Sequence, residues 1–215
     1  MKKLFFIPLI VFLISCQPSK ITQSWTAKDV VPKKYKKILV LGVLTDNDNE
    51  LQAKIEDHLA GDLRDIGYNA LAANKIFPAG TFVKGDTARA KASLEGKGFD
   101  GILTVVLLDK KKDRYYVPAK VTEYDTYYDR LGRFNQYYNV ITERIYSPGY
   151  YGEETKYVWE NNFYDLESKK MIYSARSRSF DYTSKTMLAH TYGLLMAESL
   201  VNKKILIKPE KTEEE

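Results

Sequence analysis

A run of seven mostly apolar residues at positions 102–108 constrains the fold of this chain more than any other segment. Asp100 and Gly101 precede the run, and a charged cluster at 109–114 follows it. The run is too short for a free-standing helix and too apolar for a strand with one face in water. It therefore predicts a strand that is buried on both faces, in the middle of a sheet covered by helices.

The segments before this run predict two further strands and two helices. Residues 37–44 form a second apolar strand, and in residues 50–66 the apolar side chains recur on one helical face. A short strand is expected within residues 68–73. Asp86 is a suitable N-cap for a helix at 87–95, which leads into the central strand. This alternation is typical of right-handed parallel crossovers.

Antiparallel pairing is expected after the central strand. Residues 110–113 predict a hydrophilic hairpin turn, and residues 115–123 a returning strand. A second hairpin is expected from 157–166 and 171–180, where small residues alternate with cations. A last helix is predicted at 184–203. The fold class is therefore α/β, with α+β character in the second half: two or three layers around a mixed sheet of about five to six strands.

The first residues are typical of a secretory signal. Lys2 and Lys3 precede an apolar segment at 4–13 that is too short to span a membrane. Residues 13–16, Leu-Ile-Ser-Cys, resemble a bacterial lipobox. The resemblance implies cleavage before Cys16 and acylation of this residue, whose chains would anchor the protein stably. The alternative is an ordinary secretory signal with an incidental cysteine.

These boundaries divide the chain into four parts and one insertion. We expect a signal peptide at 1–15, the lipidated cysteine with a tether at 16–35, and a domain at 36–204 that contains a tyrosine-rich insertion at 125–152. Residues 205–215 form a charged tail. No other cysteine is present, so no internal disulfide is expected.

The residues after Cys16 and the charge of the mature chain indicate its location and partners. In lipoproteins an Asp directly after the acylated cysteine marks inner-membrane retention, and an acidic run marks surface export in some lineages. Neither is present here. We therefore expect an outer-membrane anchor that faces the periplasm. Without Lys2 and Lys3, 31 basic residues stand against 28 acidic ones, a net charge of +3, and no nucleic-acid partner is expected.

Three segments carry a resemblance to a known group of proteins. They are the strand and amphipathic helix at 38–66, the entry into the central strand at 98–103, and the hairpin at 163–175. Their order resembles a family of envelope lipoprotein domains. It includes penicillin-binding-protein activator lipoproteins, the curli-secretion lipoprotein and the amino-terminal domain of the Tol propeller protein. The resemblance covers residues 36–204. It implies an adaptor that holds other envelope proteins and assigns no functional residue.

The sequence contains no catalytic or metal-binding motif. His58 and His190 fall on different predicted helices, and Glu56, Asp57 and His58 point to different sides of a helix, which predicts a solvated surface. A nucleophile elbow and a glycine-rich phosphate loop are both missing from the sequence. We therefore expect no enzymatic activity, no metal and no cofactor.

The unusual composition lies at 115–164, which holds 12 of the 17 tyrosines. Two interpretations remain open. One is an exposed insertion whose tyrosines cover the sheet edge. The other is a recognition surface, because Tyr and Arg are enriched at binding hot spots. The candidate binding residues are Tyr127, Tyr128, Arg130, Arg133, Tyr137, Tyr138, Tyr150 and Tyr151.

The sequence as a whole predicts a lipid-anchored binding or adaptor module for another cell-envelope component. Its expected partners are the lipid bilayer, through acylated Cys16, and another envelope protein. Two alternatives remain open. One is an envelope glycan-binding or glycan-processing enzyme that uses aromatic residues as sugar platforms, and the other is a structural subunit of an envelope assembly.

Overall fold

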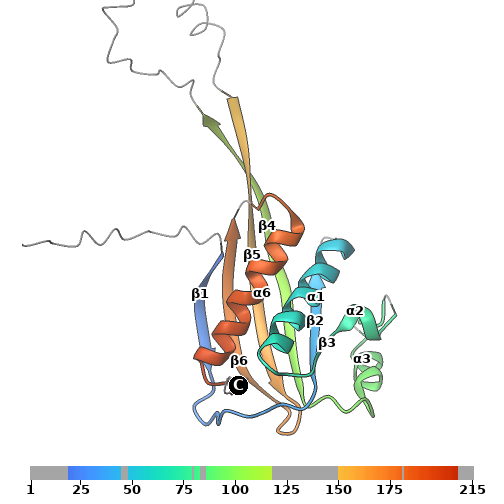
Figure 1. The fold of residues 1–215 in the computed structure, drawn as a ribbon. Coiled ribbons are helices and arrows are strands. Elements are labelled where there is room, and N and C mark those ends of the chain that lie inside the picture. The colour runs from blue at the N-terminus through green and yellow to red at the C-terminus, as the bar shows by residue number, and fades with distance from the viewer. Residues whose placement is uncertain are drawn as a thin grey trace, which may run out of the picture.

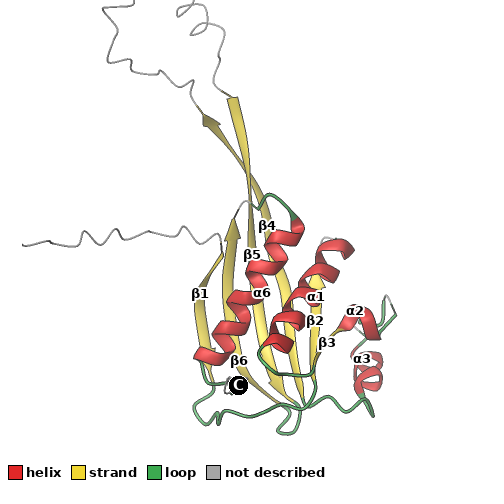
Figure 2. Cartoon of the chain, in the orientation of Figure 1, coloured by secondary structure: helices red, strands yellow, loops and turns green. Residues whose placement is uncertain are grey.

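The computed structural model describes residues 19–44, 48–78, 80–82, 86–117, 150–180 and 182–207. Helices lie against one six-stranded sheet (Figures 1 and 2). The strands are β1 (Ser19–Thr26), β2 (Ile38–Leu44), β3 (Ala70–Ala72), β4 (Gly101–Val117), β5 (Tyr150–Asp165) and β6 (Lys170–Phe180). Their order across the sheet is β1-β6-β5-β4-β2-β3.

The sheet is mixed, as the sequence predicts. β2 pairs in parallel with β3 and β4, and all other pairs are antiparallel. The predicted α/β fold class is confirmed. The order of elements differs at three points. β1 precedes the first predicted strand, and a short helix, α2 (Ala73–Ile76), follows β3 without a predicted counterpart. The predicted strand at 115–123 is not a separate element, because its described part continues β4 to Val117.

The described helices are α1 (Asn49–Asp65), α2 (Ala73–Ile76), α3 (Thr87–Leu94) and α6 (Lys185–Asn202). Side chains at the predicted starts cap three of them. Asp48 accepts a hydrogen bond from the Leu51 amide, Asp86 from Arg89, and Ser184 from Met187. None of the helices in the described ranges is long and apolar enough to cross a membrane.

The main core lies between one sheet face and the pair α1 and α6, which pack side by side (Figure 1). Leu103, Val105 and Leu107 of β4 point into it and are fully buried. The helices contribute Leu51, Ile55, Leu59, Leu63, Leu188, Tyr192, Met196 and Leu200. β4 is therefore a central strand, as its apolar run predicts.

The opposite face of the sheet is covered only in part. A smaller cluster of Leu39, Ala73, Phe77 and Ile102, with partly buried Leu94 of α3, covers the end of β4 near Gly101. Farther along the strand Leu108 is 44% exposed. The prediction that this run is buried on both faces is therefore wrong for its second half, because α2 and α3 are too short to cover it.

β4 and β5 extend beyond the helix-covered sheet as an arm of residues 110–117 and 150–157 (Figure 1). β6 still pairs with Lys156 and Tyr157 at its base, and the arm is two-stranded from the pair Lys112 and Thr155 outward. The hairpin turn predicted at 110–113 is wrong. Those residues continue the ladder with β5, and the ion pairs Lys156–Asp113 and Arg114–Glu153, both 2.9 Å long, cross between the strands. The charged residues that predict a turn in the sequence therefore belong to a strand, and two of them, Asp113 and Arg114, form ion pairs across the arm.

Both ends of the domain extend beyond their predicted limits. The tether assigned to 16–35 contains β1, an edge strand paired with β6. Ser19 is buried, and its hydroxyl lies 2.7 Å from the Ser179 hydroxyl and also contacts the Tyr182 hydroxyl. At the other end, Ile205 and Leu206, assigned to the charged tail, belong to the core.

Candidate functional site

The outer part of the arm is the most prominent candidate binding surface among the described residues. Tyr115, Tyr116, Tyr150 and Tyr151 are between 49% and 73% exposed there. The six outermost described residues, 115–117 and 150–152, carry no charge. Large aromatic side chains with a polar end, left exposed in this way, are typical of contact surfaces.

Both faces of the arm carry tyrosines. Tyr116 is paired with Tyr151, and their ring centroids lie 5.3 Å apart. Because successive side chains in a strand alternate between faces, Tyr115 and Tyr150 lie on the opposite face. There the Tyr115 ring covers Gly152, where an added Cβ would lie 2.6 Å from Tyr115 Cζ. The arm is thus held together by its own aromatic contacts.

The base of the arm is charged, and several of its charges form ion pairs. Lys156 hydrogen-bonds to Asp113 and lies 3.3 Å from Glu154, and Arg114 pairs with Glu153. The hydrogen bond from Lys156 holds the pKa of the Asp113 carboxyl below its usual range, and the same bond raises the pKa of Lys156. The arm therefore has a charged, water-compatible base and an uncharged aromatic outer part.

Two of the predicted binding residues lie on this surface, Tyr150 and Tyr151. They pair within the arm and do not cover the sheet edge. The others, and the lipidation site Cys16, lie outside the described residues: Tyr127, Tyr128, Arg130, Arg133, Tyr137 and Tyr138. Tyr115 and Tyr116 are not among the predicted binding residues. The signal that identifies them is the opposite charge of Arg114 and Glu153, which face each other, and of Asp113 and Lys156, which pair diagonally.

A second candidate is a cavity of about 410 Å³ beside the carboxyl end of β2. It exists because β3 pairs only with residues 38–40 and leaves the rest of this edge without a neighbouring strand. Gln52 of α1, Asn74 of α2, and Phe77 and Phe82 line it. Its wall is mixed and combines aromatic rings with amide groups.

Glu56 lines this cavity, but hydrogen bonds within the fold engage both of its carboxylate oxygens. It is buried and accepts hydrogen bonds from the Gly42 amide at 2.8 Å, the Asn74 amide at 2.7 Å and Gln52 Nε2 at 3.2 Å. Burial raises the pKa of Glu56, and these bonds oppose the rise. The predicted solvated surface is therefore wrong at Glu56, which fastens α1 to β2 and α2.

A third cluster lies between α1 and α6, where His58 and His190 meet with ring centroids 5.7 Å apart. Asp62, one turn from His58, is buried, and its Oδ2 atom has no hydrogen-bond partner in the described part of the chain. Burial raises the pKa of Asp62 to about 6, and the charge of His190 opposes the rise. No group of three His, Cys, Asp or Glu side chains among the described residues is arranged to hold a metal ion.

Comparisons with known proteins identify similar folds only. No family model and no curated protein sequence matches the chain, so the resemblance to the adaptor families stays a prediction. Solved structures similar to it include the PelC dodecamer from Paraburkholderia phytofirmans, with 10% identity, coverage of 87% of this chain and 98% of that one, and a TM-score of 0.48. Lipoprotein GNA1162 from Neisseria meningitidis has 14% identity, coverage of 78% and 99%, and a TM-score of 0.42. At these values neither the function nor the assembly of either protein can be transferred to this chain.

Proposed function

We propose that this chain is a lipid-anchored binding module of the bacterial cell envelope that holds another envelope component through the arm. The observation that carries the proposal is the arm itself, which extends from the helix-covered sheet and exposes four tyrosines without packing them on the domain. Because these tyrosines do not pack into the core of the domain, they are free to contact a partner.

Binding is favoured over catalysis by the chemistry of the cavity. Among the described residues, Glu56 is the one carboxylate that lines it, and its hydrogen bonds there go to the backbone or to Gln52. A carboxyl group held in this way is not available to transfer a proton to a substrate. The arm contributes only ion-paired carboxylates at its base.

The anchor in the proposal is Cys16, in the outer membrane and facing the periplasm. It is supported by the lipobox-like residues 13–16 and by Gln17, where Asp would mark inner-membrane retention. The fold adds one consistent feature. Its first strand begins at Ser19, three residues after Cys16, so an acylated cysteine would hold the domain close to the lipid.

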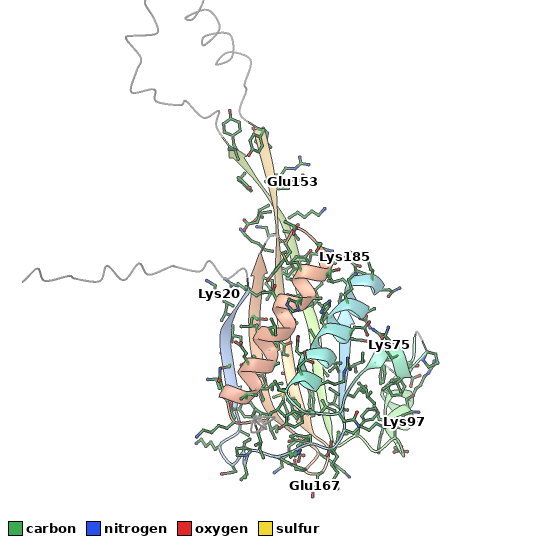
Figure 3. All side chains as sticks on the ribbon, viewed as in Figure 1. Lys20, Lys75, Lys97, Glu153, Glu167 and Lys185 are labelled. Atoms are coloured by element: carbon green, nitrogen blue, oxygen red, sulfur yellow. The ribbon has the colours of Figure 1, made fainter. Side chains whose placement is uncertain are left out.

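Photocrosslinking in intact envelopes tests the proposal. A photoreactive phenylalanine analogue replaces Tyr151 on the arm, and in a matched control it replaces Glu167, an exposed residue at the opposite end of the sheet (Figure 3). We expect a discrete crosslinked product, protein or lipid, from Tyr151 and none from Glu167. Equal crosslinking at both positions, or none at either, contradicts a contact surface on the arm.

A further inference from the structure

We propose that the arm lies in the headgroup region of the leaflet that holds Cys16, so that the component it binds is the membrane surface itself. The inference rests on one part of the proposed function, the acyl anchor at Cys16. It adds an orientation of the domain on the membrane and a partner for the four exposed tyrosines.

The short link between Cys16 and the fold limits the distance from the lipid. Only two residues separate Cys16 from Ser19. Three residue steps of extended chain span no more than about 11 Å. Ser19 is fixed, because it is buried and its hydroxyl contacts those of Ser179 and Tyr182. The membrane surface therefore passes within about 11 Å of this end of β1.

The strand register places the base of the arm at the same level as Ser19. Ser19 pairs with Ser179. Ser179 pairs with Tyr157, and Tyr157 pairs with Lys110. From this row the arm extends to Val117, about 23 Å away, while β1 runs about the same distance in the opposite direction. Figure 1 shows the start of β1 and the base of the arm at the same end of the sheet.

These lengths exclude an arm that points away from the membrane. In that orientation the body of the domain would extend from Ser19 toward the lipid for about 23 Å, twice the reach of the link. The far end of the body carries Lys33 in ion pairs with Asp165 and Glu167. Placing these charges in hydrocarbon is strongly unfavourable. The arm therefore runs along the membrane or toward it.

The pattern of residues along the arm selects between these two orientations. In the first, β1 faces the lipid edge-on and the arm stands about 10–14 Å farther away, because β5 lies two strand spacings and β4 three from β1. In the second, the arm points toward the lipid. Its charges end at Arg114 and Glu153, about 13 Å from the row of Ser19 and just beyond the reach of the link. The described residues that extend farther, 115–117 and 150–152, are uncharged.

That uncharged part has the chemistry of a membrane interface. Tyr rings are enriched at the level of the lipid headgroups, where the ring is partly buried and the hydroxyl stays hydrated. Tyrosines on both faces suit a ribbon surrounded by headgroups, whereas a flat protein partner would contact one face. The arrangement therefore favours the second orientation.

Single-thiol labelling of the full-length lipidated protein in phospholipid vesicles tests the inference. Cys16 is the only cysteine, and acylation blocks its thiol, so an added cysteine is the only reactive one. An environment-sensitive fluorophore is attached in three variants: Tyr151→Cys on the arm, Lys20→Cys beside the anchor, and Glu167→Cys at the far end (Figure 3). Nitroxide-labelled lipids in the vesicles quench fluorophores that touch the bilayer.

We expect the fluorophores at Tyr151→Cys and Lys20→Cys to lose most of their emission, and the one at Glu167→Cys to keep it. Quenching at Lys20→Cys alone would leave the anchor in place and overturn the orientation. If unmodified protein takes up one label, its Cys16 thiol is free, and the anchor and the orientation both fail. A crosslink from Tyr151 to a protein in envelopes, without quenching in vesicles, would keep the binding role and exclude the lipid surface as the partner.

Discussion

Replacing Asp62 by Asn should stabilise the protein, and increasingly so as the pH rises. Asp62 lies between α1 and α6, where its Oδ2 atom is buried against Gly193 and has no hydrogen-bond partner in the described part of the chain. His190 of α6 faces it with a charge that favours the carboxylate, and Asp65 of α1 opposes that effect. Asn keeps the size of the side chain and removes the charge.

The size of the expected stabilisation follows from the pKa of Asp62. Burial raises the pKa of Asp62 from 3.8 to about 6. A shift of this size corresponds to about 3 kcal/mol. Because the folded state binds this proton more tightly than the unfolded state, the free energy of unfolding falls as the pH rises from 3.8 to 6. The advantage of Asp62→Asn should therefore grow by about 2 kcal/mol between pH 4.5 and pH 7.5.

Urea unfolding followed by tryptophan fluorescence measures this difference. Trp159 is fully buried beside Tyr192 of α6, so its emission reports the packing of this layer. Asp65→Asn on the same helix is the companion variant, since Asp65 is exposed and its removal takes away one of the charges that act on Asp62. Other titrating groups cancel when each variant is compared with wild type at one pH.

A flat difference between Asp62→Asn and wild type across this range would refute the reasoning, whatever its size. It would mean that the carboxylate is solvated or paired in the folded state. A difference that falls with rising pH would mean that His190 dominates and that the charged form of Asp62 is the stabilising one.

Three further substitutions test the anchor and the packing at Glu56. Cys16→Ala should move the protein from the membrane fraction to the soluble fraction, because one residue carries all the acyl chains. A variant that still sediments with membranes, together with wild-type protein that takes up no palmitate label, contradicts the anchor. Gly42→Ala should destabilise the fold by about 1–3 kcal/mol, since the new Cβ would lie 2.8 Å from Gln52 Cγ and 3.1 Å from Glu56 Oε1. Gly61→Ala is the control: its Cβ would meet only the end of Arg64, at 3.7 Å, and should stabilise α1 by about 0.5–1 kcal/mol. Thermal melting measures both variants, and equal melting temperatures would show that the Gly42 site has room for a Cβ.

The local elements could be predicted from the sequence because their signals are local. Apolar residues at Leu51, Ile55, Leu59 and Leu63 place one face of α1 in the core, and Ser184 caps α6 at the predicted residue. In β6 the small residues point into the core and the arginines point out, as the alternation predicts. Each of these features depends on neighbours within one or two turns or one strand.

The features that sequence reasoning missed depend on distant partners. The charges at 110–114 suit a turn until their partners at 153–156, about forty residues later, are known. β1 becomes a strand through its pairing with β6, more than 140 residues away. Glu56 is buried because Gly42 leaves room for its carboxylate on the edge of β2. None of these contacts leaves a periodic pattern in the chain.

The position of β1 has a mechanical consequence for a protein held by Cys16. A force on the anchor enters the fold at Ser19 and acts along β1, parallel to the strand. The hydrogen bonds between β1 and β6 run across the strands and so carry such a load together. A pull from the side would open the same ladder one pair at a time, from Ser19 to Thr26. The domain should therefore resist tension along its strands better than tension across them.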